Sequence, residues 1–314
     1  MPPHSHAHHH HDHAHAHAGD ARRARLGRAF AIGIALNLTF VVIEISCGLI
    51  ANSLALVADA VHNLSDVVGL ILAWGASALA LRPPSARFTY GLRGSTILAA
   101  LANAMLLLVV TGGIAWEALL RLKNPGAPDE SLMVWVALAG IAINGGTAWL
   151  FMADRKSDLN VRGAYLHMAA DAGISLGVAL AGAAIMLTGW RWLDPAISLF
   201  IVATIFVGTW GLLRDSVKLA LHAAPESVDP DDVRRYLCAL PGVVELHDLH
   251  IWGMSTTDTA LTAHLVMPAG HPGDDFFAEV VHEIEHRFRI GHVTIQIETG
   301  TSANPCALAP DHVV

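Results

Sequence analysis

The chain has 314 residues, of which 54% are hydrophobic and only 15% are charged, and its mean hydropathy is +0.48. This is more apolar side chain than one soluble core needs, so the composition indicates a membrane protein. The formal net charge of −8 gives no reason to expect a nucleic acid as partner. The cysteines are widely spaced and form no CxxC pair, which fits a reduced cytosolic setting without disulfides; they are Cys47, Cys238 and Cys306.

The first segment, residues 1–25, is rich in histidine. Residues 4–17, HSHAHHHHDHAHAH, contain nine histidines and no apolar periodicity. We expect this segment to be disordered and cytoplasmic, where its neutral imidazoles could collect divalent metal weakly. An expression tag is the alternative interpretation.

Six apolar runs follow, and each is long enough to cross a bilayer as a helix, which takes roughly 20 residues. Charged or proline-containing breaks mark four of the five gaps between them. Together they predict an all-α, six-helix transmembrane domain over residues 26–218. The runs cover residues 29–51, 54–80, 96–118, 131–153, 164–188 and 195–214.

Lysine and arginine are distributed unevenly between the two sides of these runs. If the N-terminus is inside, the cytoplasmic segments hold twelve of them and the opposite loops hold only Arg121, Lys123 and Arg191. Because positively charged loops are retained on the cytoplasmic side, both termini are predicted to be cytoplasmic. In one cytoplasmic loop, Arg87, Tyr90 and Arg93 are expected to contact the soluble domain or lipid headgroups.

The composition changes near Ala220, and a soluble domain is predicted over residues 219–300, followed by a flexible tail over residues 301–314. An α-β-β-α-β order suggests two helices packed on one face of a small sheet. The expected elements are a helix over 231–240, strands over 243–252 and 261–267, a helix over 274–288 and a strand over 293–298.

The stretch HEIEH, residues 282–286, matches the HExxH pattern of zinc proteases. At about 100° per residue, however, His282 and His286 lie opposite the apolar stripe of their helix and face water. A protease would need both histidines turned into a cleft with a third ligand, so we do not interpret this motif as proteolytic. The stripe expected to face the sheet consists of Phe277, Val280, Val281, Ile284 and Phe288.

Ionisable residues inside the apolar runs are more informative, because a charge at the bilayer centre costs about 2.5–3.5 kcal/mol. The second run contains His62 and Asp66, and the fifth contains His167 and Asp171. In each pair the histidine precedes the aspartate by four residues, which places both side chains on one helix face. For either pair alone, hydrogen bonding between helices is an equally good interpretation.

Two such faces brought together would offer two imidazole nitrogens and two carboxylates, a four-ligand set that suits Zn²⁺. Mg²⁺ and Ca²⁺ prefer oxygen ligands alone, whereas cadmium, cobalt and nickel remain compatible with the set. Protons compete for the same ligands, which suggests exchange of metal against protons. Asp59, one turn before His62, is interpreted as a residue that orients a ligand, a proton carrier or an inter-helix hydrogen-bond partner.

Several longer stretches resemble the cation diffusion facilitator family of metal exporters. They are NSLALVADAVHNLSD, FTYGLRGSTILAALANA, LNVRGAYLHMAAD, HDLHIW and HVTIQIE. The resemblance implies a bacterial inner-membrane transporter, not an enzyme, that needs no cofactor and exports Zn²⁺, with Cd²⁺ or Co²⁺ as possible further substrates, in exchange for protons. It also implies a ferredoxin-like cytoplasmic domain that pairs in a homodimer. By position, His62, Asp66, His167 and Asp171 match the family's transport ligands in its zinc-preferring form.

Some members of the family also bind structural or regulatory metal in the cytoplasmic domain. The positions that look similar here are His247, His264 and Glu298, with His250 and Asp274 nearby. Some relatives have another histidine where this chain has Gln296, which argues against a complete two-metal site. Ordinary surface histidines are the alternative interpretation.

Two other functions are compatible with an intramembrane metal site. A membrane-anchored metal sensor would signal through the soluble domain, but nothing C-terminal resembles a kinase, a cyclase or a DNA-binding module. A channel is disfavoured because rapid conduction needs weak binding.

Overall fold

A computed structural model describes residues 35–152, 159–301 and 306–309 of the chain. The histidine-rich segment therefore lies outside the described residues, and so does part of the predicted tail. The chain divides into two compact units, one of Met1–Val67 with Val109–Phe206 and one of Val68–Leu108 with Val207–Val314.

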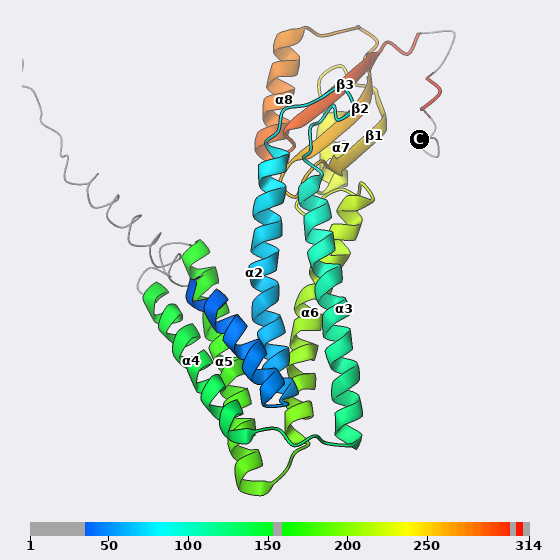
Figure 1. The fold of residues 1–314 in the computed structure, drawn as a ribbon. Helices are drawn as coiled ribbons and strands as arrows, with labels where there is room; N and C mark the ends of the chain where they lie inside the picture. The colour runs from blue at the N-terminus through cyan, green and yellow to red at the C-terminus, as the bar shows by residue number, and fades with distance from the viewer. Residues whose placement is uncertain (1–34, 153–158, 302–305, 310–314) are drawn as a thin grey trace, which may run out of the picture. The chain divides into compact units, whose positions relative to one another are not determined.

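Five helices in the described residues are long and apolar enough to cross a membrane. Each matches one of the last five predicted runs, although the helix Glu130–Phe151 ends before the run 131–153 does, and a shorter apolar helix over Ala35–Ile50 corresponds to the first. The first run begins at residue 29, outside the described residues, so the sixth span stays a prediction. The five helices are α2 (Leu54–Ala80), α3 (Ser95–Lys123), α4 (Glu130–Phe151), α5 (Leu159–Thr188) and α6 (Leu193–Ala220) (Figure 1).

These helices expose apolar side chains and bury polar ones. Trp74, Val109 and Leu187 are among the most exposed large side chains, whereas Glu44 and Asn144 are completely buried. This distribution is what a hydrocarbon environment requires, because lipid can surround the apolar surface but cannot satisfy polar groups. The exposed apolar side chains are therefore the lipid-facing surface of the helices.

The start of α2 is fixed by a carboxylate from α6. Asp194 is buried and accepts hydrogen bonds from the Ser53 hydroxyl at 2.6 Å and from the backbone N–H groups of Leu54 at 2.9 Å and Ala55 at 3.1 Å. The first N–H groups of a helix have no partner within the helix, and its positive end favours an anion. Asp194 thus joins α6 to α2 about two turns before His62.

Helices α4 and α5 lie side by side (Figure 1) because small residues let them approach. A Cβ atom added at Gly140 would lie 2.8 Å from the Ser175 hydroxyl, and one at Gly182 would lie 2.8 Å from the Val134 side chain. Any larger residue would force the helices apart. This packing sets the position of the α5 face that carries His167 and Asp171.

The cytoplasmic domain has the predicted α-β-β-α-β order, with ends that differ by a few residues. Its sheet has the order β1-β2-β3, with β1 and β2 antiparallel and β2 and β3 parallel. The ferredoxin-like fold implied by the resemblance has a fourth strand, and the described residues contain three. The elements are α7 (Pro230–Cys238), β1 (Glu245–Gly253), β2 (Thr259–Val266), α8 (Asp274–Phe288) and β3 (His292–Glu298).

The core of this domain lies between the sheet and helices α7 and α8. Leu261, Ala263 and Leu265 of β2 are buried against Val280 and Ile284 of α8, together with Leu237 of α7. The prediction for α8 is confirmed for Val280, Ile284 and Phe288, which are buried at positions i, i+4 and i+8. It is wrong for Val281, which is 37% exposed, and for Phe277, in whose place Phe276 packs against the core, because the contact with the sheet is narrower than expected. His282 and His286 are exposed, as predicted.

Within the second unit, the loop before α3 contacts the cytoplasmic domain. The Arg93 guanidinium lies 3.3 Å from the Asp258 carboxylate, the Thr256 N–H donates to the Thr96 hydroxyl at 3.1 Å, and the Tyr90 ring meets His292 edge-on. Of the two predicted partners for this loop, the soluble domain is thus observed.

Candidate metal centres

The two His-Asp pairs predicted in the membrane helices lie together in the first unit. The His62 Nε2 atom lies 3.5 Å from Asp171 Oδ1, and the His167 Nε2 atom lies 3.2 Å from Asp66 Oδ2. His167 Nε2 is also 3.6 Å from Asp171 Oδ2. Each histidine therefore contacts the aspartate of the other helix, and α2 and α5 contribute one imidazole and one carboxylate each.

Exposure differs sharply among the four side chains. The Asp171 side chain is 2% exposed and that of His62 is 20% exposed, whereas Asp66 and His167 are 36% and 42% exposed. A carboxylate as deeply buried as Asp171 needs a permanent counterion or hydrogen-bond donor. The two imidazoles are the groups near enough to provide one.

The donor atoms fit a small divalent metal. One ligand atom each from Asp66, His167 and Asp171 lies within 4.8 Å of the others, and His62 joins this group through its contact with Asp171. Oδ1 of Asp171 and Oδ2 of Asp66 are buried and face the imidazoles of His62 at 3.5 Å and His167 at 3.2 Å, without a well-directed hydrogen bond within the described residues. Two imidazole nitrogens and two carboxylates that face one another in this way form a donor set that Zn²⁺ accepts.

Asp59 and Glu44 are buried near these pairs but hold other partners. Asp59 accepts a hydrogen bond from the Ser175 hydroxyl on α5 at 3.1 Å, which matches the inter-helix interpretation among the three considered. Glu44 accepts one from the Asn63 side-chain amide at 3.0 Å. Asn63 follows His62 directly, so this hydrogen bond ties Glu44 to the turn of α2 that carries the histidine.

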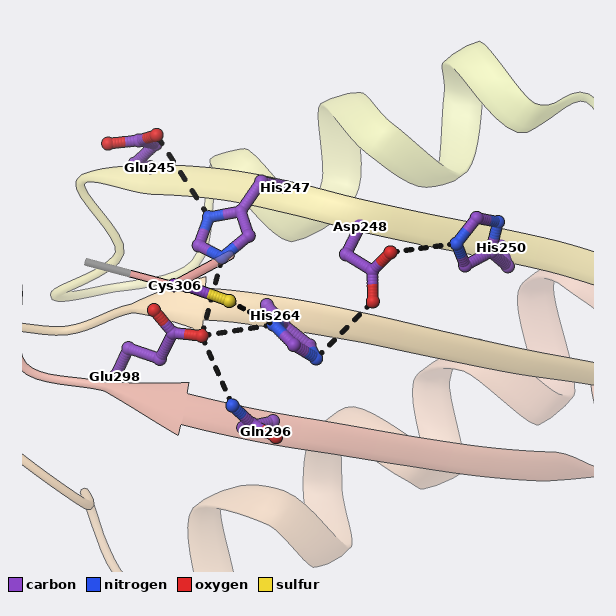
Figure 2. Close-up of polar contacts among 8 residues, drawn as sticks. All are labelled: Glu245, His247, Asp248, His250, His264, Gln296, Glu298 and Cys306. Carbon is purple, nitrogen blue, oxygen red and sulfur yellow. Dashed lines mark hydrogen bonds and ion pairs between the residues drawn. The ribbon is translucent and has the colours of Figure 1, made fainter. Parts of the chain in front are cut away.

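A second cluster lies in the cytoplasmic domain and depends on a bulge in β1. The pairing of β1 with β2 shifts between His247 and His250, where Asp248 has a φ of +51°, in the left-handed region. Side chains alternate between the two faces of a regular strand, so Leu246 and Ile251, five positions apart, would lie on opposite faces. Both are nevertheless in the core. The extra residue thus lets apolar side chains on both sides of the bulge face the helices, while His247, Asp248 and His250 lie on the other face (Figure 2).

The strand register brings three predicted residues together. His247 pairs with His264 across β1 and β2, and Glu298 lies on β3 two residues beyond Gln296, the partner of His264. The Glu298 Oε1 atom is 3.0 Å from His264 Nδ1 and 3.3 Å from His247 Nε2 (Figure 2). Burial by itself would raise the pKa of Glu298, but the Cys306 thiol and the two histidines outweigh it and lower that pKa.

Asp248 holds the outer side of His264. Its carboxylate lies 3.4 Å from His264 Nε2 and 2.8 Å from His250 Nε2 (Figure 2). This leaves His264 Nδ1 directed at Glu298. His250 is therefore a neighbour of Asp248 rather than a member of the central group, and Asp274, at the start of α8, is exposed.

One member of this cluster was missed by sequence reasoning. The Cys306 Sγ atom lies 3.6 Å from His264 Nδ1, and ligand atoms of His247, His264, Glu298 and Cys306 all lie within 4.8 Å of one another. No spacing rule could have found it, because a single cysteine eight residues beyond the last strand has no partner in the sequence. His282 and His286 belong to neither group that could hold a metal ion in the described residues.

A set of membrane-length helices that carries a His-Asp cluster, attached to a small α+β domain, defines an integral membrane protein with a candidate metal centre. Residues 30–219 match the family described as "Cation efflux transmembrane domain", and residues 225–300 match "Cation efflux protein, cytoplasmic domain". The chain belongs to the cation diffusion facilitator family, and it is a cation efflux transporter rather than an enzyme.

Curated relatives of the chain include bacterial metal transporters. The chain is 38% identical to the metal cation efflux system protein CzcD of Cupriavidus metallidurans, over 90% of this chain and 88% of the relative. It is 35% identical to the zinc transporter ZitB of Escherichia coli, over 86% of each chain. A cadmium, cobalt and zinc/H(+)-K(+) antiporter of Bacillus subtilis is 34% identical over 87% of this chain and 89% of the relative.

Proposed function

We propose that this transporter exports Zn²⁺ from the cytoplasm in exchange for protons, with Cd²⁺ and Co²⁺ as further substrates, and that His62, Asp66, His167 and Asp171 bind the metal in transit. The observation that carries this proposal is the pair of reciprocal His-Asp contacts between α2 and α5, at 3.2 and 3.5 Å. The names of the relatives, which include zinc, cadmium and cobalt transporters, support the choice of metals.

The charges of the site explain why protons serve as the exchanged ion. With both histidines protonated and both aspartates ionised, the four side chains are neutral in sum. When Zn²⁺ binds, each imidazole releases one proton from the nitrogen that becomes a ligand, and two carboxylates balance the metal. The proton-loaded and the zinc-loaded site are therefore both neutral. This matters because an uncompensated charge within the membrane has a high free energy.

The arrangement of the helices suits exchange between two sides of a membrane. The ligands come from two helices, so a small movement of α5 against α2 could change which side reaches the site without dismantling either His-Asp pair. We propose six spans, with residues 29–51 as the first, both termini in the cytoplasm and the protein in the bacterial inner membrane. The ferredoxin-like character of the cytoplasmic domain and its pairing in a homodimer belong to the same proposal.

Transport into sealed proteoliposomes tests the assignment of the site. We expect Asp171→Asn to abolish zinc uptake under an imposed pH gradient and to abolish the accompanying proton movement, followed with a pH-sensitive dye trapped inside. Asp275→Asn, the same change at an exposed position of α8, serves as the matched control. Undiminished zinc flux in Asp171→Asn would sink the four-ligand site, and zinc flux that neither requires nor dissipates the pH gradient would sink proton exchange.

We further propose that His247, His264 and Glu298 hold a resident metal in the cytoplasmic domain. The support is the convergence of two imidazole nitrogens on one carboxylate oxygen, at 3.0 and 3.3 Å. Such a metal would bridge all three strands of the sheet. The contacts of Arg93 and Tyr90 with the same domain give it a route to the membrane helices.

A further inference from the structure

The thiol of Cys306 is directed at the cytoplasmic cluster although it comes from outside the sheet. Its sulfur lies 3.6 Å from Nδ1 of His264, and the residue is half-buried (Figure 2). Neither of the other cysteines has such surroundings: Cys238 is exposed, and Cys47 belongs to the first apolar helix. Cys306 is thus the cysteine that the described residues place among potential metal ligands.

The distances fit a tetrahedral metal. Zinc bonds of about 2.0–2.3 Å place neighbouring ligand atoms about 3.3–3.8 Å apart in a tetrahedron. The measured separations are 3.0 Å from His264 to Glu298, 3.3 Å from His247 to Glu298 and 3.6 Å from Cys306 to His264. The three remaining separations are within 4.8 Å, so the ligand atoms need to shift by about an ångström at most.

The surroundings hold these ligands in place. Asp248 holds Nε2 of His264, which leaves Nδ1 free to bind a metal. Gln296, which stands where some relatives have another histidine, donates to Glu298 Oε1 at 3.1 Å. Nδ1 of His247 lies 4.0 Å from the Glu245 carboxylate, and Nε2, 3.3 Å from Glu298, is the nitrogen directed at the cluster.

We propose that Cys306 is the fourth ligand of a closed metal site with His247, His264 and Glu298, and that metal binding fastens residues 306–309 to the face of the sheet opposite α7 and α8. Zn²⁺ and Cd²⁺ are the ions this mixed nitrogen, oxygen and sulfur set would take. The thiol gives its proton to solvent and binds as thiolate. This proposal rests on the cytoplasmic site proposed above and is independent of the transport site, whose four ligands include no sulfur.

Cobalt absorption of the full-length protein in detergent tests the fourth ligand. In a Cys47→Ser, Cys238→Ser background, we expect one equivalent of Co²⁺ to produce a near-ultraviolet thiolate-to-cobalt charge-transfer band. The band should disappear in Cys306→Ser and in His264→Gln, which keeps the thiol but loses a neighbouring ligand. His250→Gln is the matched control and should retain the band, since His250 contacts Asp248 outside the ligand group.

Alkylation gives a second measurement that does not depend on cobalt. Zn²⁺ should slow labelling of Cys306 by a maleimide at least tenfold in the same background, and His264→Gln should remove this protection. Absence of the cobalt band, or equal labelling with and without zinc, overturns the proposal. If the protein shows the thiolate-to-cobalt band but transports no zinc in vesicles, only the transport proposal fails. Failure of the cytoplasmic site and failure of the transport site can therefore be distinguished.

Discussion

The unequal burial of the two transport-site aspartates makes a ranked prediction. Asp171 is 2% exposed and contacts both histidines, at 3.5 and 3.6 Å, whereas Asp66 is 36% exposed and contacts one. Asparagine preserves the shape of either side chain but removes one negative charge. The loss of zinc affinity should therefore be much larger at Asp171 than at Asp66.

The magnitude follows from burial. Removing one partner of a buried charge pair costs about 3–5 kcal/mol, because the remaining charge stays desolvated and unpaired. At about 1.4 kcal/mol per factor of ten, Asp171→Asn should weaken zinc binding by about two to three and a half powers of ten. Water screens the more exposed position, so Asp66→Asn should lose less by about a power of ten.

Competition with a fluorescent zinc chelator, on full-length protein in detergent, measures these affinities. His264→Gln in all variants would remove the cytoplasmic site from the titration, and Asp275→Asn serves as the control for the charge change. Equal losses at the two aspartates, or a larger loss at Asp66, would refute the inference from burial.

Three further predictions concern the fold and the exchange. Asp194→Asn should lower the Tm in detergent, because a buried cap at the start of α2 loses its charge and one acceptor, a loss of about 1–3 kcal/mol. Asp275→Asn, the same change at an exposed site, should leave the Tm unchanged. Gly182→Ala should destabilise by about 1–3 kcal/mol because its Cβ would meet Val134 at 2.8 Å, while Gly145→Ala, whose Cβ meets nothing within 4 Å, should be tolerated. If the zinc-loaded and the proton-loaded site are both neutral, the rate of zinc uptake should depend on the pH gradient and not on an imposed membrane potential. A site that carried a net charge across the membrane would instead change in energy by about 2.3 kcal/mol per elementary charge and 100 mV.

The features that could be predicted from the sequence are local ones. The four-residue spacing of His62 and Asp66, and of His167 and Asp171, determines which helix face carries them, so their sharing of a face within each helix followed from the pattern alone. The alternation of β3 and the stripe of α8 likewise follow from their periods. The meeting of the two His-Asp pairs of α2 and α5 was only expected from their positions in separate apolar runs. Tertiary contacts were needed to show it.

The missed features all involve residues far apart in the chain. The caps at the start of α2 come from Asp194, and the fourth donor of the cytoplasmic cluster comes from Cys306; neither has a periodic signal. The bulge at Asp248 was invisible because a one-residue insertion leaves the strand's composition unchanged, yet it decides which face His247 occupies. Val281 was assigned to the core because a helical stripe read from sequence has no fixed width.

The two clusters differ in ways that suit different tasks, if both proposals hold. The membrane cluster has no sulfur donor and two of its side chains are more than a third exposed, so metal can enter, compete with protons and leave. The cytoplasmic cluster includes a thiol, and its histidines are only 4% and 13% exposed, which favours retention. A retained metal in the same domain as the contact of Arg93 with Asp258 would report cytoplasmic zinc to the helices before the transport site fills. The order in which the two sites bind zinc therefore distinguishes regulation from incidental binding. In a zinc titration, protection of Cys306 from alkylation should precede zinc binding at Asp171.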